Sequence, residues 1–405
     1  MWTRSRTALL FDSEIRDEGW RRGNVIGFTL SEDLLEIQAR ARKFAQDEIA
    51  PIAAEYDRRG EVPPDLGLKA KAAGLSNLTI PQEFGGMGYG AFENAIIGEE
   101  LAAGCAGMAA TILVNGLALT PIHLYGTLEQ KRTFLEPTAR AGKFGAFCLT
   151  EREAGSDAGS IKTTALPDGD ELVINGVKCF VTSGSLAEVM VVFALTDPER
   201  GPRGASAIVV PRSMPGISVT KVEDKMGQRA SNTAELSFEN VRVPRANILG
   251  KPGWGFSYAL QCLDFGRSGV AALSVGVARA ALEHAVEYAK SRKQFGSPIM
   301  ANQGISFLLA DMAMKVEAAR LLTWQAAWLA DRGERVVMKA AMAKCFASDT
   351  AMEVTTNAVQ VMGGVGYMRD HPVEKLMRDA KLLQIYEGTN QIQRMVIARQ
   401  LAKGG

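Results

Sequence analysis

Helical periodicity dominates the first part of the chain. Ser31 is a good helix N-cap, because its side chain can accept a hydrogen bond from a backbone amide of the first turn, and the acids Glu32 and Asp33 suit the positive end of the helix dipole. Apolar residues then recur at the spacing of one helix face, and the pattern returns three times. We expect helices that start at Ser31 and that span residues 64–73, 91–103 and 128–141.

Between about residues 144 and 243 the apolar period changes to two. Short runs rich in Val, Leu and Ile alternate with turn sequences such as Asn175-Gly176, which is typical of a hairpin. The runs predict strands that include residues 172–174, 189–194, 207–210 and 236–238. We expect this segment to form a small antiparallel β domain, either a barrel or a sandwich.

From Trp254 onward the helical period returns in long Ala- and Leu-rich runs, over residues 268–293, 303–331, 335–362 and 372–384. Four long helices with short connections predict a bundle. The expected fold class is therefore α+β. Its expected parts are an N-terminal extension (residues 1–29), an N-terminal helical domain (30–143), a middle β domain (144–253) and a C-terminal four-helix bundle (254–405). The sequence has no strand–GxGxxG–helix unit, so a Rossmann-type nucleotide site is not indicated.

The composition of the chain excludes some classes of function. The chain has 405 residues, of which 47% are hydrophobic and 22% charged, and its 46 basic against 45 acidic residues leave a net charge of +1. Such a balance gives no overall attraction to nucleic acid or to an anionic membrane, and no apolar run approaches the roughly 20 residues of a membrane span. We therefore expect a small-molecule task, with no nucleic-acid partner and no membrane span.

The cysteines and the N-terminal residues bear on the compartment. Five Cys and three His are scattered without the spacing of metal ligands, which indicates reduced thiols and no metal site. Residues 1–22 are rich in Arg but also contain Asp and Glu, which are rare in transit peptides. These features favour a cytoplasmic bacterial protein over one in the mitochondrial matrix.

The best candidate for acid–base chemistry is Glu387, which stands beside Gly388 at an apparent helix break. The residues before it are apolar, and desolvation by them would raise the pKa of the carboxyl and place a base nearer neutrality: Leu382, Leu383, Ile385 and Tyr386. Gly388 allows a turn, and Thr389 can cap the next helix. On local features alone, however, a solvated or backbone-capping Glu is the more common explanation.

Six motifs occur along the chain in a fixed order. They are FCLTEREAGSDAGSI (residues 147–161), KCFVTSG (178–184), KMGQRASNTAELSFENVRVP (225–244), SRKQFG (291–296), QVMGGVGY (360–367) and IYEGT (385–389). In this order and spacing, over about residues 31–403, the chain resembles the acyl-CoA dehydrogenases. Each motif alone would be weak, because Gly-rich loops mostly turn the chain.

The resemblance implies an FAD-dependent dehydrogenase that converts a saturated acyl-CoA thioester to a trans-2-enoyl-CoA. Glu387 would remove the α proton while a hydride leaves the β carbon for flavin N5. An electron-transfer flavoprotein would then accept the electrons. The implied assembly is a homotetramer, arranged as a dimer of dimers. The resemblance thus reverses the local preference for a solvated Glu387.

The resemblance also implies three groups of cofactor contacts. The pyrimidine edge of the flavin would meet Phe147, Leu149 and Thr150, and its dimethylbenzene side and N5 would meet Phe180 and Thr182. The adenosine and pyrophosphate would be held across a dimer interface by Arg292, Phe295, Gln303, Gln360, Gly363 and Gly364. The chain's own C-terminal segment would add Thr389 and Gln391.

Implied substrate contacts lie in four places. Ser156 would contact the pantetheine arm of the thioester and belongs also to the cofactor group, Gly388 would lie where the substrate passes the base, and the CoA side would involve Asp264, Arg267 and Arg399. Arg399 is equally well explained as a surface charge. The acyl pocket would include Ala109, Ile112 and Leu113, and since the stretch around them lacks a cation, we expect an acyl chain without a carboxylate.

Departures from the family pattern leave two alternatives open. Arg152-Glu153 replaces a common Pro-Gly or Pro-Asn, and Phe147 and Phe180 replace a frequent Tyr and Trp. Gly266 stands where some branched-chain members place their base, which leaves Glu387 as the sole candidate. An acyl-CoA oxidase that uses dioxygen would share these motifs, although such oxidases are longer. A non-enzymatic DNA-binding member of the fold is disfavoured by the near-zero net charge and the intact YEGT.

Overall fold

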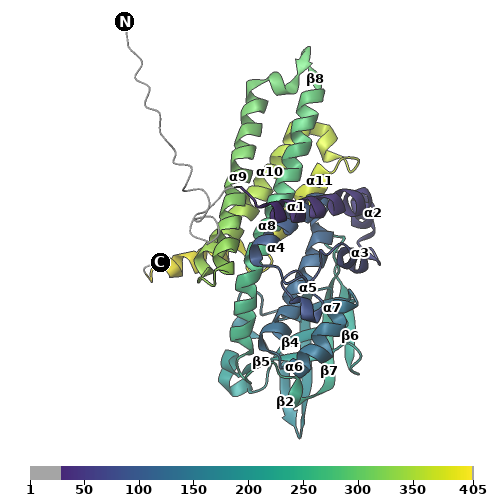
Figure 1. Cartoon of the computed structure of the whole chain (residues 1–405), viewed down its shortest axis with the longest axis vertical. Helices are drawn as coiled ribbons and strands as arrows, with labels where there is room; N and C mark the ends of the chain where they lie inside the picture. Colours follow the sequence, from purple (N-terminus) through teal and green to yellow (C-terminus); the bar gives the residue numbers. More distant parts are fainter. Residues whose placement is uncertain (1–28, 404–405) are drawn as a thin grey trace.

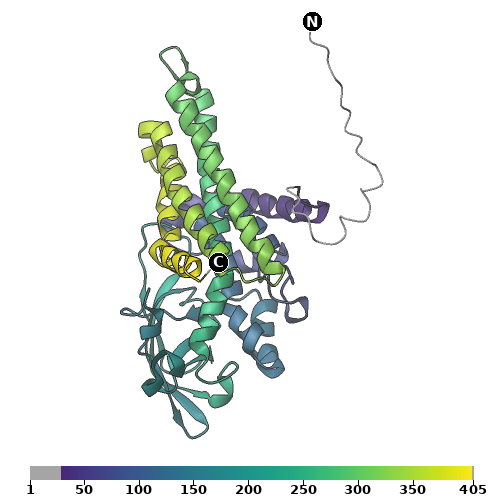
Figure 2. The ribbon, with the colours of Figure 1, turned by 90° about the vertical axis from the view of Figure 1, so that its left-hand side faces the viewer.

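The computed structural model describes residues 29–403, so the predicted N-terminal extension lies almost wholly outside the described residues. Long helices run the length of the molecule, a curled sheet lies at one end, and the N-terminal helices cross the middle (Figure 1). Turning the molecule by 90° shows the sheet packed beside the lower part of the helices (Figure 2). The order of helices, strands and helices is the predicted one.

The N-terminal region is helical, as the pattern predicts. Its helices are α1 (Glu32–Phe44), α2 (Ala50–Arg59), α3 (Leu66–Ala72), α4 (Ala91–Gly104), α5 (Ala106–Tyr125), α6 (Leu128–Gln130) and α7 (Glu136–Arg140), with π-helical turns at Ala45–Ile49 and Lys131–Leu135. The Ser31 side chain accepts a hydrogen bond from the Leu34 amide, which confirms the predicted cap. Residues of α5 are apolar on almost every face, so the sequence shows no helical period there.

The middle region is one seven-stranded sheet in the order β1-β4-β2-β3-β7-β6, with β5 also paired to β4. The strands are β1 (Gly145–Cys148), β2 (Thr164–Asp168), β3 (Glu171–Thr182), β4 (Val189–Leu195), β5 (Ala205–Pro211), β6 (Ile217–Val222) and β7 (Thr233–Pro244). The expected antiparallel pairing needs one correction, because β1 and β2 both pair with β4 in parallel. The β2–β3 hairpin intervenes before β4, and this long connection lets β4 return in the direction of β1.

Successive side chains of strand β4 face two different cores. Val191 and Phe193 face a core shared with the helices, whereas Met190 and Val192 face a second core enclosed by the curled sheet itself. All seven residues of β4 are buried, so the strand is apolar on both faces. The same alternation in β1 directs Phe147 toward the core shared with the helices, and β1 itself packs against α5 of the N-terminal region.

The C-terminal region is a helical bundle built around a very long helix. Its elements are α8 (Gly255–Ser291), the hairpin strands β8 (Lys293–Gln294) and β9 (Ser297–Pro298), α9 (Gln303–Asp331), α10 (Val337–Met362), α11 (Val373–Leu383) and α12 (Asn390–Leu401). Helix α8 begins at Gly255 rather than at residue 268, and α11 is short. Helix α4 packs on α8, and a single apolar core contains residues from α1, α4, α5 and α8 to α11. The two helical regions therefore share one core.

Two helices, α5 and α8, are long and apolar enough to cross a membrane by length and composition alone. In each helix, 67% of the apolar 18-residue stretch is buried inside the fold. Such burial is what a core helix shows, because its apolar surface is already covered by protein.

The three regions interlock around Asp379 on α11, which is fully buried. Its carboxylate accepts hydrogen bonds from Lys375, at 2.6 Å, and from the backbone amide of Gln228 in the loop before β7. The Lys375 ammonium also lies 3.2 Å from the thiol of Cys105, between α4 and α5. Gly227 is required here, since a Cβ on it would lie 2.2 Å from the Arg378 carbonyl oxygen. One buried carboxylate thus connects all three regions.

We expect Asp379→Ala to lower the free energy of unfolding by about 3 kcal/mol, because it leaves the buried Lys375 ammonium without its partner. Chemical denaturation at fixed protein concentration measures the loss. The matched control is Asp370→Ala, at an exposed Asp before α11, which should change the unfolding free energy little. Equal effects of the two substitutions would contradict a structural role for the Asp379 junction.

Candidate active site

The connection between α11 and α12 contains two consecutive residues in the left-handed region. Glu387 has a φ of 53° and Gly388 a φ of 90°. For a residue with a side chain this conformation costs roughly 1–2 kcal/mol, so the surrounding structure must hold Glu387 in place. Thr389 caps α12 by accepting a hydrogen bond from the Ile392 amide, as predicted.

Two buried side chains hold the carbonyl groups of this turn. The Gln393 amide donates to the carbonyls of Glu387, at 3.2 Å, and Gly388, at 2.9 Å. The Lys344 ammonium, on α10, donates to the Gly388 carbonyl and to the Asn390 side chain, both at 2.9 Å. Neither Lys344 nor Gln393 was predicted from the sequence. The only available signal for Lys344 was a Lys inside the apolar run AAMAKCFA, over residues 340–347.

The Glu387 side chain lies at the end of an apolar cavity between α5 and α8. Its Oε2 atom is buried and accepts no hydrogen bond among the described residues. A Cβ on Gly266 would lie only 2.3 Å from this oxygen, so the carboxylate rests against the bare backbone of α8. Most of the side chains that line the cavity beside it are apolar: Leu78, Ile112, Leu113, Val114, Leu117, Cys262, Phe265, Val270, Leu273 and Tyr386. Polar groups are added to the lining by Asn77, Thr79, Asn94 and Thr120.

Desolvation raises the pKa of Glu387 to about 7, and the nearby charges of Lys344 and Arg267 oppose that rise. The direction is the predicted one, but its source differs. Ile385 is 47% exposed, and of the apolar neighbours named from the sequence only Tyr386 lines the cavity. The remaining cavity wall comes from α5 and α8, which are distant in sequence. A pKa near neutrality leaves much of the carboxyl ionised at neutral pH and makes the ionised form a stronger base than an ordinary Glu.

Two of the three predicted acyl-pocket residues border the cavity. Ile112 and Leu113 line the cavity, whereas Ala109 is fully buried in the helical core. Leu113 closes one side of the cavity and packs tightly on Gly98 of α4. A Cβ on Gly98 would lie 3.2 Å from the Cδ1 atom of Leu113. The described lining contains no Lys or Arg. The cavity therefore suits an apolar group.

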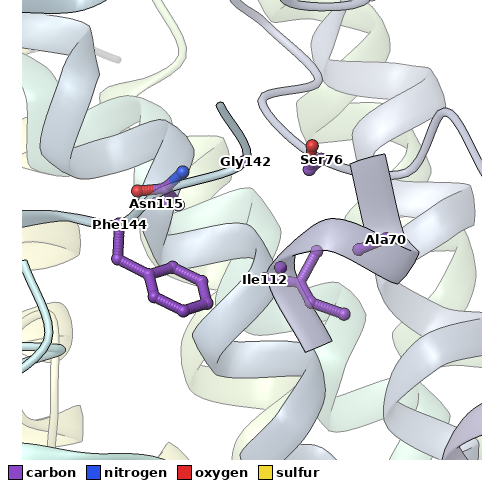
Figure 3. Close-up of a pocket in the computed structure, with 7 residues that line it drawn as sticks. Ala70, Ser76, Ile112, Asn115, Gly142 and Phe144 are labelled. Atoms are coloured by element: carbon purple, nitrogen blue, oxygen red, sulfur yellow. The ribbon is translucent and has the colours of Figure 1, made fainter. Parts of the chain in front are cut away.

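A second, much smaller hollow lies behind Ile112, between α3, α5 and the start of the sheet (Figure 3). Its volume of ≈ 10 Å³ has room for about one water molecule, too little for a substrate. Asn115 borders it and accepts a hydrogen bond from the Gly145 amide at 2.7 Å while donating to Asn77. These bonds fix α5, and with it the cavity wall, to the first residue of β1.

The predicted flavin contacts of the β domain come together in the structure. Thr150 follows β1, and its carbonyl accepts a hydrogen bond of 2.8 Å from the Cys179 amide on β3. Phe180 follows at a φ of 53° with 64% of its surface exposed. The other members of the group lie on or directly after these two strands: Phe147, Leu149 and Thr182.

Buried charges fix the Leu149–Thr150 segment to β3. Lys178 is fully buried, and its ammonium donates to the Leu149 carbonyl, at 3.0 Å, and to the Glu151 carboxylate, at 2.7 Å. Glu151 accepts two further bonds from the backbone amides of Lys162 and Thr163. Lys178 and Glu151 were not among the predicted site residues. The segment is thus rigidly placed beside Phe180, which suits the binding of a planar ring.

A groove of ≈ 800 Å³ lies at the far end of α8, around the β8–β9 hairpin. It brings together four predicted residues, Arg292, Phe295, Gly363 and Gly364. A Cβ on either glycine would meet nothing within 4 Å, and Phe295 is fully exposed. The groove thus offers a guanidinium, an aromatic ring and open backbone, which fit a phosphate and a heterocycle.

The other predicted residues lie outside these three sites. Gln303 begins α9 and Gln360 lies on α10; both are exposed, and neither lines the groove. The substrate-side positions are more scattered. Asp264 pairs with Arg267 on α8 near Glu387, whereas Ser156 and Arg399 are exposed on a loop and on α12. Gln391, a predicted cofactor contact, is also exposed on α12. Among residues 29–403, no three His, Cys, Asp or Glu side chains are grouped as metal ligands.

A base of near-neutral pKa that faces an apolar cavity suits an enzyme that takes a proton from a weakly acidic carbon. Three family models match the chain: the N-terminal domain (residues 31–142), the middle domain (146–241) and the C-terminal domain (253–402) of acyl-CoA dehydrogenase. The chain therefore belongs to the acyl-CoA dehydrogenase family, and it is an oxidoreductase.

Individual relatives agree with this assignment. The acryloyl-CoA reductase (NADH) of Anaerotignum propionicum is 45% identical over 97% of this chain and 100% of its own length. The acyl-CoA dehydrogenase of Bacillus subtilis is 45% identical over 93% of this chain and 99% of its own length. Among solved structures, butyryl-CoA dehydrogenase from Megasphaera elsdenii superposes with a TM-score of 0.91, at 42% identity over 93% of this chain and all of its own.

We expect Gly266→Ala to lower the rate of acyl-CoA dehydrogenation by about 100-fold, because the new methyl group displaces the Glu387 carboxylate and a shift of about 1 Å can have that effect. The melting temperature of Gly266→Ala should equal that of the wild type, since Ala is favourable inside a helix and the carboxylate is the end of a flexible side chain. A control is Gly304→Ala on α9, where a Cβ meets nothing within 4 Å. Unchanged activity of Gly266→Ala would contradict the observed contact.

Proposed function

We propose that this protein oxidises a saturated acyl-CoA thioester to a trans-2-enoyl-CoA, with FAD as its cofactor and Glu387 as the base. The observation that carries the proposal is the buried, unpaired Oε2 atom of Glu387 at the end of an apolar cavity. An oxygen in that state can accept a proton from a substrate without first breaking a hydrogen bond. The cavity lining, free of Lys and Arg where it is described, supports an acyl chain without a carboxylate.

The backbone of the turn supplies a second element of the reaction. None of the hydrogen bonds among residues 29–403 uses the Glu387 amide N–H. A thioester carbonyl bound to this N–H becomes more polarised, which lowers the pKa of the α C–H. The proton then moves from the α carbon to the Glu387 carboxylate. Bound FAD supplies the acceptor for the hydride that leaves the β carbon.

The fit of FAD rests on the β-domain group and on the groove. The rigid segment at Leu149 and Thr150 offers polar backbone beside Phe180 for the flavin ring, and the groove offers Arg292 for the pyrophosphate. A flavin ring that takes the hydride must lie beside the base, and the base is far from the groove, so the groove cannot hold the other end of the same cofactor within a single chain. Gly266, which touches the base, and Arg292 are 26 residues apart along α8, or about 39 Å at about 1.5 Å per residue.

A second copy of the chain is therefore part of the proposal, with its groove completing the site of the first. Mixed oligomers test this arrangement. Arg292→Glu weakens the groove and Glu387→Gln removes the base, so each variant alone should be inactive. A random one-to-one mixture should recover about a quarter of native activity, because half of the dimers would hold one complete site of two. No recovery, with mixing verified by mass, would contradict a shared site.

The electrons would pass to an electron-transfer flavoprotein. A chain from a structure of the electron transferring flavoprotein of Acidaminococcus fermentans is 47% identical to this one, with a TM-score of 0.91 over 93% of this chain and 99% of its own. That likeness supports an acceptor of this kind without excluding dioxygen. Stoichiometric hydrogen peroxide formed during turnover would instead assign the protein as an oxidase.

The direct test is anaerobic mixing of the FAD-loaded protein with saturated acyl-CoA esters. Wild-type flavin should bleach, with a rate that rises with pH through about 7 as Glu387 loses its proton. Glu387→Gln should bleach about 10³-fold more slowly, because an amide cannot accept the proton. The control is the FAD content of the variant, which should equal that of wild type. Native bleaching by Glu387→Gln would overturn the proposal.

A further inference from the structure

Lys344 is a buried cation for which the proposed reaction has no chemical use. It is fully buried in α10, a helix whose neighbouring residues are mostly Ala. Burial lowers its pKa to about 8, with the Glu387 charge as the first opposing influence. At neutral pH it is therefore mainly an ammonium. A buried ammonium is costly unless its three donors are used.

The hydrogen bonds of Lys344 are directed at the turn that contains Glu387 and Gly388 and at the start of α12. One donor meets the Gly388 carbonyl and a second meets the Asn390 side chain. Asn390 is in turn fixed by its own amide, which donates to Ser348, at 2.9 Å, and Asp349, at 2.7 Å. Lys344 therefore holds the Glu387–Gly388 turn from α10, while Gln393 holds the same turn from α12.

The charges around the two groups can be named from every element that packs on them. Glu387 is faced by Lys344 from α10 and by Arg267 from α8. Lys344 is faced by Glu387, Cys345, Asp349 and Arg267. Asp349 is already paired with Arg394, at 2.6 Å, and Arg267 with Asp264. Of the two cations that act on Glu387, Arg267 has its own carboxylate partner, whereas Lys344 forms no ion pair among residues 29–403.

We propose that Lys344 is a positioning residue for the base: it holds the left-handed Glu387–Gly388 turn through the Gly388 carbonyl and places a positive charge beside the Glu387 carboxylate. The inference rests on the proposed function of Glu387. It separates two effects, since the hydrogen bond fixes the backbone while the charge keeps the carboxylate ionised. Loss of the charge makes Glu387 a weaker acid, and the base is then protonated at a higher pH.

Two substitutions separate these effects. Lys344→Gln keeps a hydrogen-bond donor but removes the charge, and Lys344→Met removes both with similar volume. In anaerobic flavin reduction, both variants should shift the acid limb of the rate–pH profile upward by about one pH unit, the effect of removing one nearby opposite charge. Only Lys344→Met should also lose thermal stability, because the Gly388 carbonyl and the Asn390 side-chain oxygen then each lose one of their two hydrogen-bond donors.

Lys71→Met, at an exposed Lys on α3, is the matched control and should change neither quantity. An acid limb that stays in place in Lys344→Gln would overturn the inference, whatever happens to the melting temperature. If Lys344→Met does not fold, Lys344→Gln still decides the question. Failure of the proposed function is a different result, since it appears as native bleaching in Glu387→Gln with Lys344 intact.

Discussion

The buried carboxylate of Asp379 is the interaction on which the rest of the structure depends. It lies on α11, pairs with Lys375 on the same helix and accepts a hydrogen bond from the Gln228 amide in the β domain. Helix α11 leads directly into the turn that carries Glu387, and the cavity wall comes from α5 and α8. A base placed between separate regions stays aligned only if those regions cannot shift, and buried polar junctions with all partners present give such rigidity.

Opposing electrostatic effects set the protonation state of the base, and desolvation is the larger of them. Burial disfavours the ionised form of Glu387, while the cations Lys344 and Arg267 favour it, and the resulting pKa is about 7. The left-handed backbone adds strain, which the bonds from Gln393 and Lys344 offset. Strained, desolvated groups of this kind lower stability locally and occur where a protein needs chemical reactivity.

Local patterns predicted those parts of the structure that local forces determine. The Ser31 and Thr389 caps and the breaks between helices follow from contacts within a few residues. The start of α8 and the parallel pairing of β1 with β4 were not predicted, because distant strands and helices decide them. Lys344 was missed for the same reason: its partners lie 44 and 46 residues further along the chain.

The contact between Gly266 and Glu387 bears on how catalysts in this family diverge. The two positions share one volume, so a carboxylate can be carried by the helix or by the turn, but not by both. Moving the base from one to the other needs two substitutions. The intermediate has either two like charges forced together or none at all. The carboxylate on the turn therefore requires a residue without a side chain at the helix position opposite it.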